Sequence, residues 1–510
     1  MLKKIFKTKN TSTNADEIFS TEGLKKDLKG NTIRGGAFTL IAQISKFIIR
    51  MGSMIVLARL LVPDDYGLLG MVTVITTFIE IFKDLGLSAA TIQKAEINHK
   101  QVSTLFWINV AMGFALMLCV AAIAPTIALF YHDPRLINIT FVLAGNFLIS
   151  SLGHQHRALL QRQMHFKSLA KIEISSIVVG NLVAIALAVY GMGYWALVFM
   201  QVADAVVNSV GFWLASGWRP GAPSRNAGIR SMLLFGGNLA GFRCVSFFSL
   251  NLDNILIGRF WGSQQLGLYA RAYQLLLLPV QQINNPLNSV ALPALSALQT
   301  DPERYRAFYR KAILATTSFG MPIIAFMFAV SDKVILLMLG TRWLGVVPLF
   351  QLLAPAAFVG TFEVATRWAY QSLGRTDRQL RAGLVLSILN VAIFSISIRW
   401  GASGIALAYG LSQPLFALPA IIYCYHGTIL KLSDFTGTVY KPFLASIGAA
   451  TVVIVFNHLP NIDLNIFTSL FIDCLIYSLS YLGIWMLMPN GKETLLDMLK
   501  SVKSAKVKPA

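Results

Sequence analysis

Charged residues are scarce in this chain of 510 residues, at 13% of the total, while hydrophobic residues make up 55%. A soluble domain normally carries about 25% charged residues, so the composition excludes an ordinary soluble protein. Apolar runs of about 18 residues or more recur along the chain, and each is long enough to cross a bilayer as a helix. The sequence therefore predicts an all-α, polytopic membrane protein.

Cysteine and nucleotide-binding motifs are equally sparse. The four cysteines are Cys119, Cys244, Cys424 and Cys474. Each lies within an apolar run and none forms a CxxC pair, which argues against a disulfide framework or a zinc site. The chain also lacks a GxxxxGK[ST] loop, so we expect no ATP hydrolysis on it. We predict no metal, no cofactor and no catalytic residue.

Hydrophobic segments predict fourteen transmembrane helices in two six-helix bundles with two further helices. The predicted helices lie near residues 35–62, 67–84, 105–130, 136–160, 170–190, 193–216, 229–259, 264–290, 306–330, 344–366, 379–399, 402–424, 437–456 and 466–488. The predicted domains are a basic arm at 1–30, an N-terminal bundle at 31–225, a C-terminal bundle at 226–430, two added helices at 431–490 and a basic tail at 491–510.

Basic residues are distributed unevenly over the predicted loops. One alternate set of loops, together with both termini, holds 33 Lys and Arg, whereas the other set holds six. We call the first the basic side, and the positive-inside rule places it in the cytoplasm. The basic N-terminal arm is therefore interpreted as a topology signal and not as a nucleic-acid-binding segment. The bilayer is the expected surroundings, and the expected location is the bacterial inner membrane.

One short phrase occurs twice in the chain. Residues 59–70 read RLLVPDDYGLLG, and residues 259–270 read RFWGSQQLGLYA, so that Arg59 aligns with Arg259 and Gly67 with Gly267. Six predicted helices begin between the two copies, and an even number returns the chain to the same side of the membrane. The phrase therefore indicates a parallel repeat, a plan in which two similar bundles surround a central site.

Polar side chains concentrate in the first two helices of each repeat, whereas the other ten predicted helices are much more apolar. In the first helix Gln43, Lys46 and Arg50 follow at intervals of three and four residues, which places them on one face. The candidate substrate-binding residues are Gln43, Lys46, Arg50, Asn238, Arg243, Asn254, Arg271 and Gln274. Glu80 and Asp253 are the candidates for coupling transport to protons or sodium.

Basic residues outnumber acidic ones in these four helices. Charges inside a bilayer are costly, so they face a cavity or a partner. One interpretation is a hydrated cationic cavity for an anionic ligand, because arginine and lysine bind phosphate oxygens well. The alternative is structural pairing between helices, for example of Lys46 with Glu80 or of Arg243 with Asp253.

Several segments resemble a known family. They are VLARLLVPDDYGLLGMVTVITTFIEIFKDLGLSAATIQ at 56–93, STLFWINVAMG at 103–113, HRALLQRQMHFKSLAKIE at 156–173, LDNILIGRFWGSQQLGLYARAYQL at 252–275 and the stretch 291–311. They resemble bacterial polysaccharide exporters of the multidrug/oligosaccharidyl-lipid/polysaccharide superfamily, most closely the branch that exports colanic acid and other exopolysaccharides. The resemblance covers roughly residues 30–430.

The resemblance implies a flippase that works by alternating access. Its substrate would be an oligosaccharide repeat unit linked through pyrophosphate to undecaprenol, for exopolysaccharide or lipopolysaccharide synthesis. A polysaccharide polymerase and its chain-length machinery would be partners. The family has no invariant catalytic motif to carry over, and coupling to protons or sodium varies within it.

Two other functions remain open on sequence alone. A multidrug exporter of the same superfamily would extrude amphipathic cations and would favour acidic residues in its cavity, whereas basic residues lead here. A membrane-embedded polysaccharide polymerase or glycosyltransferase would normally carry a large outer loop, whereas the predicted outer connections are short. A scaffold that transports nothing would leave the intramembrane charges without a use.

Overall fold

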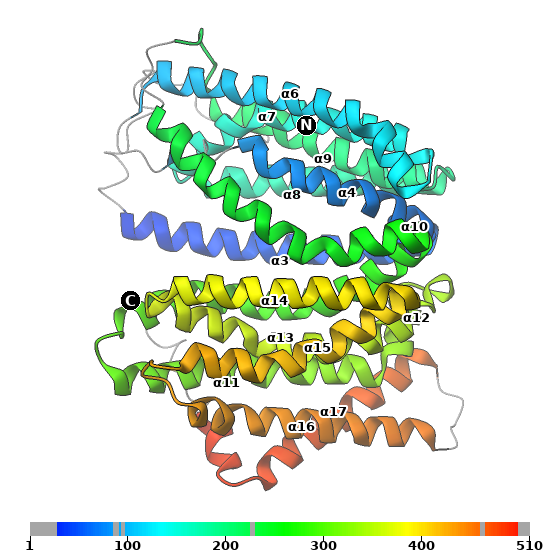
Figure 1. The fold of residues 1–510 in the computed structure, drawn as a ribbon, viewed down its shortest axis with the longest axis vertical. Helices are drawn as coiled ribbons and strands as arrows, with labels where there is room; N and C mark the ends of the chain where they lie inside the picture. The colour runs from blue at the N-terminus through cyan, green and yellow to red at the C-terminus, as the bar shows by residue number, and fades with distance from the viewer. Residues whose placement is uncertain (1–27, 85–90, 93–96, 225–229, 460–464, 498–510) are drawn as a thin grey trace. The chain divides into compact units, whose positions relative to one another are not determined.

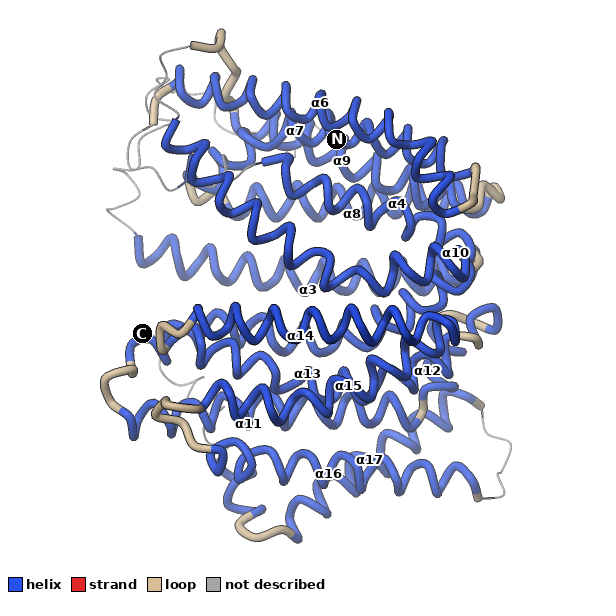
Figure 2. The backbone as a smooth tube through the Cα atoms, in the orientation of Figure 1, coloured by secondary structure: helices blue, strands red, loops and turns tan. Residues whose placement is uncertain are grey.

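The computed structural model describes residues 28–84, 91–92, 97–224, 230–459 and 465–497. Throughout that part of the chain the regular elements are helices and no strand occurs (Figure 2). Each of the fourteen predicted ranges overlaps one of these helices, which confirms the all-α fold class. Ten helical stretches of the described residues are long and apolar enough to cross a membrane.

The chain divides into two compact units, of which unit 1 comprises Met1–Gly267. Its helices are α3 (Leu28–Leu60), α4 (Pro63–Asp84), α6 (His99–Tyr131), α7 (Arg135–Arg162), α8 (Phe166–Val189), α9 (Tyr194–Ser216) and the first part of α10 (Arg230–Ala297). Within the unit, α7 packs against both α6 and α9, and α8 packs against both α9 and α3 (Figure 1).

Unit 2 comprises Leu268–Ala510. It contains the rest of α10, followed by α11 (Pro302–Ala329), α12 (Ser331–Met338), η1 (Thr341–Trp343), α13 (Val346–Ser372), α14 (Thr376–Ser397), η2 (Ile398–Trp400), α15 (Gly401–Tyr425), α16 (Leu432–His458) and α17 (Ile466–Leu487). Here α13 packs on α11 and α15, and α16 packs on α11 and α17. The predicted bundle boundary at 225 follows the repeat and stays a prediction.

Local sequence explains where several helices begin and bend. Asn98 caps α6 by accepting from the Gln101 backbone N–H, and the Gln101 side chain returns a bond to the Asn98 N–H. Asp301 caps α11 by accepting from the Arg304 backbone N–H at 3.1 Å, and Pro302 follows at the first helical position, which needs no N–H donor. Helix α10 is interrupted at Gly262, whose φ of 79° suits a residue without a side chain. The sequence predicted separate helices on either side of this glycine.

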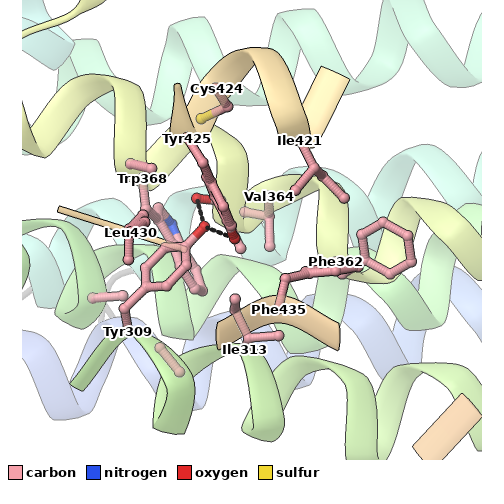
Figure 3. Packing of buried hydrophobic residues seen from close by; sticks show 14 of the residues in the cluster. Tyr309, Ile313, Phe362, Val364, Trp368, Ile421, Cys424, Tyr425, Leu430 and Phe435 are labelled. Atoms are coloured by element: carbon pink, nitrogen blue, oxygen red, sulfur yellow. Dashed lines mark hydrogen bonds between the residues drawn. The ribbon is translucent and has the colours of Figure 1, made fainter. Parts of the chain in front are cut away.

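A core of buried side chains holds unit 2 together at its basic side. It draws on α10, α11, α13, α15 and α16 (Figure 3). The Tyr425 hydroxyl donates to the Tyr309 hydroxyl at 3.0 Å, and Tyr309 donates to the Ala365 carbonyl at 3.0 Å. Because these hydroxyls have hydrogen-bond partners, the rings of Tyr309 and Tyr425 contribute apolar area to the core without leaving their own polar atoms unpaired.

Helices α16 and α17 are tied to the rest of unit 2 at the other side by one lysine. The Lys333 ammonium, from α12, donates to Asn457 at 2.8 Å, Ser469 at 2.7 Å and Asp473 at 2.6 Å. These three bonds use every proton of the ammonium group. Asp473 is almost fully buried, and the Lys333 ammonium compensates its negative charge in this buried position.

The repeated phrase packs against itself inside unit 1. A Cβ atom on Gly67 would overlap the Ser263 carbonyl, and one on Gly267 would overlap the Pro63 carbonyl. Gly67 thus contacts Ser263, and Gly267 contacts Pro63. These two contacted residues align with each other under the same shift of 200 positions. Two backbones that approach this closely leave no room for a side chain on either glycine. The repeat is therefore preserved at a close contact between α4 and α10.

Candidate functional site

Helix α3 presents the polar stripe that the sequence predicts. Gln43 and Arg50 are exposed, and Lys46 between them is partly buried. Two to three turns further along, Leu57 packs with Ala184 and Ala188 of α8. This apolar contact fixes α3 against α8 and brings Lys46 to the part of α8 that precedes Ala184.

Lys46 forms a charged cluster with two residues of other helices. Its ammonium pairs with Glu173 of α8, and Arg157 of α7 donates to the second oxygen of the same carboxylate at 2.9 Å. The exposed fractions of the side chains are 13% for Lys46, 23% for Glu173 and 49% for Arg157. Two cations share one carboxylate, so this cluster, which we call the Lys46 cluster, keeps one net positive charge.

Lys46 does not pair with Glu80, the residue offered as an example of structural pairing. Glu80 lies on α4 and contacts Lys83 of its own helix at 3.4 Å, with its side chain 53% exposed. Lys83 in turn donates to Ser150 of α7 at 2.9 Å. Lys46 pairs with α8 because the contact between α3 and α8 is extensive, whereas Glu80 lies on a face of α4 that remains open.

The candidates on α10 fall into both units. In unit 1 Asp253 is buried, and its Oδ1 accepts from the Asn254 backbone N–H at 2.8 Å and from the Asn254 carboxamide at 3.3 Å. In unit 2 Arg271 donates to Gln274 Oε1 at 2.6 Å, and Gln274 is exposed. The side chains of Asn238 and Arg243 lie outside the described residues, so the pairing of Arg243 with Asp253 stays a prediction.

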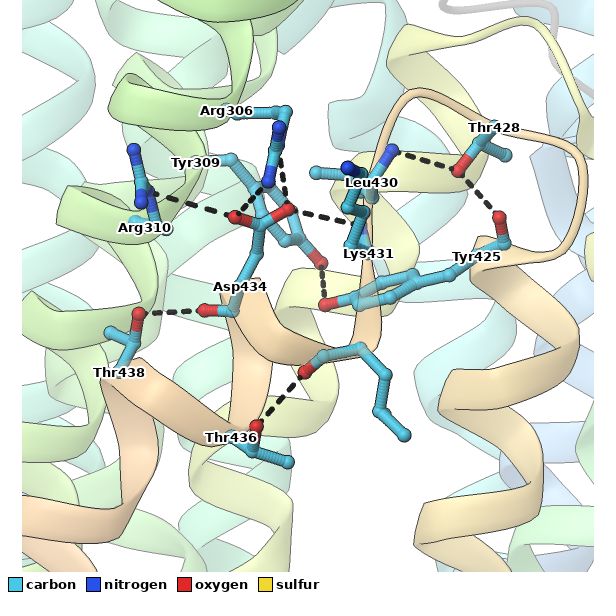
Figure 4. A network of polar contacts seen from close by, with 11 residues as sticks. Arg306, Tyr309, Arg310, Tyr425, Thr428, Leu430, Lys431, Asp434, Thr436 and Thr438 are labelled. Carbon is cyan, nitrogen blue, oxygen red and sulfur yellow. Dashed lines mark hydrogen bonds and ion pairs between the residues drawn. The ribbon is translucent and has the colours of Figure 1, made fainter.

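A second charged group surrounds Asp434 at the basic side of unit 2 (Figure 4). Arg306 of α11 donates two hydrogen bonds to the Asp434 carboxylate, of 2.8 and 2.9 Å, and the Arg310 guanidinium lies 3.8 Å from it. The Lys431 backbone N–H also donates to it at 2.9 Å. The carboxylate is 2% exposed, so this cluster anchors the start of α16 to α11 and offers little to a ligand.

A third charged group lies at the opposite side of unit 1. Arg135 bonds Asp133 through two nitrogens and reaches Asp64 of the repeated phrase at 2.8 Å. Asp64 also accepts from the Ser263 hydroxyl. Burial opposes ionisation of Asp133, but the hydrogen bonds and charge of Arg135 outweigh it and lower the pKa of that carboxyl.

Metal binding has no support in the part of the chain that the structure describes. No group of three His, Cys, Asp or Glu side chains there is placed to hold an ion. Cys119 and Cys474 are exposed, Cys424 is buried, and all three are free thiols. The candidate site is therefore a set of charged and amide side chains on helix faces.

Sequence reasoning missed Arg157 and Glu173. They lie in the predicted ranges 136–160 and 170–190, whose few charges stand near one end, so the sequence ranks both ranges among the apolar helices. Their signal was the segment 156–173, which carries Arg157 near its start and Glu173 at its end and belongs to the resemblance. Only the packing of α3 on α8 and of α7 near α8 brings these charges to Lys46.

Comparison with known proteins identifies relatives over most of the chain. The model of the family described as polysaccharide biosynthesis protein matches residues 56–348. The teichuronic acid biosynthesis protein TuaB of Bacillus subtilis (strain 168) is 30% identical over 428 residues, covering 83% of this chain and 88% of that protein. The lipopolysaccharide biosynthesis protein WzxC of Escherichia coli (strain K12) is 24% identical and covers 82% and 85%.

Solved structures share the fold. Lipid II flippase MurJ in an inward closed conformation matches with a TM-score of 0.70 at 15% identity, covering 88% of this chain and 97% of that one. An inward-facing multidrug resistance MATE family transporter of the MOP superfamily matches with a TM-score of 0.58 at 13% identity, covering 75% and 94%. At these identities the likeness shows a common helical architecture.

Proposed function

The chain belongs to the polysaccharide biosynthesis protein family, and from this premise we propose that it flips undecaprenyl-pyrophosphate-linked oligosaccharide repeat units across the bacterial inner membrane. The basic side, with both termini, faces the cytoplasm in this proposal. Names of the relatives support a role in glycan synthesis, and one of them is a succinoglycan biosynthesis transport protein of Rhizobium meliloti (strain 1021). Exopolysaccharide or lipopolysaccharide is the product that the flipped units would build.

The Lys46 cluster is the observation that carries the proposal. The single negative charge of Glu173 is shared by two cations, so neither cation is fully neutralised. Arg157 is also half-exposed. A pyrophosphate supplies several anionic oxygens, which suit the guanidinium fork and the mobile ammonium. The substrate can therefore take over bonds from Glu173 without leaving a buried cation unpaired.

A multidrug exporter of the same fold is the runner-up. Amphipathic cations would be repelled by a cluster with a net positive charge, whereas a lipid pyrophosphate would be attracted. A polymerase is disfavoured because the described outer connections are short, such as the four residues 190–193 between α8 and α9. Alternating access, coupling through Glu80 or Asp253, and contact with a polymerase and chain-length machinery belong to the proposal as well.

A strain that lacks this chain tests the function. We expect it to accumulate lipid-linked repeat units on the cytoplasmic leaflet, and we expect the restored chain to clear them. The double substitution Lys46→Gln with Arg157→Gln should insert normally but fail to clear the pool. Lys171→Gln, which removes an exposed cation of α8 two residues before Glu173, is the matched control and should clear it. A deletion strain without accumulated units would refute the proposal.

A further inference from the structure

Five carboxamide side chains crowd into eight positions of α10 in unit 2. The segment reads PVQQINNPLNSVALP between Pro279 and Pro293. The carboxamides are Gln281, Gln282, Asn284, Asn285 and Asn288, of which the first two and Asn285 are exposed. No acidic or basic residue interrupts them. We call this stretch of α10 the amide segment.

Prolines recur in the amide segment every seven residues, at Pro279, Pro286 and Pro293. Each proline lacks the N–H that would bond the carbonyl four residues earlier, so the backbone oxygen of Gln282, for example, loses its helical donor. Seven residues are nearly two helical turns, so the three interruptions fall along one strip of the helix. The strip thus adds backbone carbonyls that lack their usual helical donor to a segment already rich in amide donors and acceptors.

The depth of the segment follows from one contact with α13. The Trp368 indole donates to Asn288 at 2.5 Å, and Trp368 lies four residues before the end of α13 at Ser372. Gln281 lies two turns further from that end, which is about 16 Å along the helix axis at 1.5 Å per residue. Lipid tails cannot satisfy an amide that is exposed inside a bilayer, so we assign the exposed side of the segment to water.

We propose that the amide segment recognises the glycan of the substrate. Carboxamides donate and accept hydrogen bonds without carrying charge, which matches the hydroxyl groups of a neutral sugar. The same uncharged groups have little attraction for pyrophosphate. The segment therefore governs which glycan is accepted, while cations elsewhere bind the lipid pyrophosphate. This inference rests on the proposed function and assigns sugar specificity to Gln281, Gln282, Asn285 and Asn288.

Binding of two lipids to the purified full-length protein tests the assignment. The probes are undecaprenyl pyrophosphate alone and the lipid-linked oligosaccharide extracted from the strain that lacks this chain. We expect wild type to bind the glycosylated lipid more tightly. Gln281→Leu with Asn285→Leu should reduce that preference by about tenfold, the loss expected from removing one or two net hydrogen bonds, while binding of undecaprenyl pyrophosphate stays unchanged.

Two further variants separate specificity from folding. Gln264→Leu removes an exposed carboxamide of α10 outside the segment and should keep the wild-type preference. Gln281→Asn with Asn285→Gln retains both amides and should keep most of the preference. If wild type prefers the glycosylated lipid and the leucine variant does too, the assignment is wrong while the proposed function stands. If wild type binds neither lipid, the proposed function fails first.

Discussion

At the scale of single residues, the position of Glu173 between two cations makes the Lys46 cluster testable by opposite changes. Removing the carboxylate raises the net charge of the cluster by one, and removing the ammonium lowers it by one. If Glu173 occupies the bonds that pyrophosphate would take, the two substitutions must shift ligand affinity in opposite directions. A purely structural network would instead lose stability in both cases, because either change removes an ion pair, although Glu173 keeps Arg157 as a partner when Lys46 is replaced.

We therefore predict that Glu173→Gln tightens the binding of undecaprenyl pyrophosphate and that Lys46→Gln weakens it. Each change should be about tenfold, since one charge-assisted hydrogen bond contributes about 1.5 kcal/mol. Titration of the purified protein, followed by tryptophan fluorescence, measures both. Equal losses of melting temperature with unaltered affinity would assign the cluster to structure alone.

Asp133 gives a prediction about pH. Although burial opposes its ionisation, the bonds and charge of Arg135 lower its pKa in the folded state. Such a carboxylate stabilises the protein above its unfolded pKa of about 3.9, and that contribution is lost as the pH falls through the lower folded pKa. Asp133→Asn should therefore lower the melting temperature at pH 7, and its difference from wild type should shrink below about pH 4.

Scans of melting temperature from neutral to acidic pH measure this difference. Asp377→Asn is a suitable control, because Asp377 is exposed and makes no ion pair with any residue that the structure describes. A difference between wild type and Asp133→Asn that stays constant across the range would show that Arg135 does not favour the ionised form.

At the scale of helices, the close contact of α4 with α10 predicts that the repeated glycines tolerate no side chain. Gly67→Ala would bring a methyl group into the Ser263 carbonyl, which cannot rotate away as a side chain can. We expect a loss of about 1–3 kcal/mol, the usual cost of overpacking. Gly52→Ala in α3 is the control, because nothing lies within 4 Å of its added Cβ.

Thermal unfolding in detergent compares the two variants directly. Gly52→Ala should be neutral or stabilising, since alanine favours a helix by about 1 kcal/mol over glycine. Equal melting temperatures for Gly67→Ala and Gly52→Ala would mean that the two backbones separate at little cost.

Helix positions were predictable from the sequence, and helix partners were not. All fourteen ranges overlap described helices, and the gap between the predicted ranges 229–259 and 264–290 contains Gly262, where α10 is interrupted. The short helix α12 was missed, because its eight residues are too few to produce a membrane-spanning signal. The partner of Lys46 was missed because it depends on which faces of α3 and α8 meet, and periodicity within one helix carries no such information.

At the scale of the whole molecule, the uneven distribution of basic residues predicts topology. Tags placed at 1–30, 222–227 or 505–510 should report from the cytoplasm, and tags near 132, 262 or 460 should report from outside. Reporter fusions in cells measure each position. An outside report from 222–227 would contradict the parallel repeat, because that loop lies six predicted helices from the N-terminal arm.

The charges of the substrate and of its site also predict how transport responds to the membrane potential. An uncharged glycan and lipid tail do not respond to voltage, whereas the pyrophosphate does. Because the cytoplasm is normally negative, outward movement of this anion is electrically downhill, by about 2.3 kcal/mol per charge for each 100 mV. Cations such as Lys46 and Arg50 that moved outward with the substrate would experience the opposite electrical bias. In a loaded site the charges of substrate and protein partly cancel, so the loaded site should respond to the membrane potential less than the empty one.

We therefore predict that an inside-negative potential speeds net outward flipping, or the inward return of the empty carrier, when pH and sodium are equal on both sides. Proteoliposomes with a potassium-diffusion potential and a labelled pyrophosphate-linked oligosaccharide measure the rate. Vesicles with the same ions but no ionophore are the control. Because about 100 mV supplies more than a tenfold bias per charge, rates that do not change between zero and roughly −100 mV would exclude electrical coupling. An ion gradient or facilitated exchange would then have to drive the cycle.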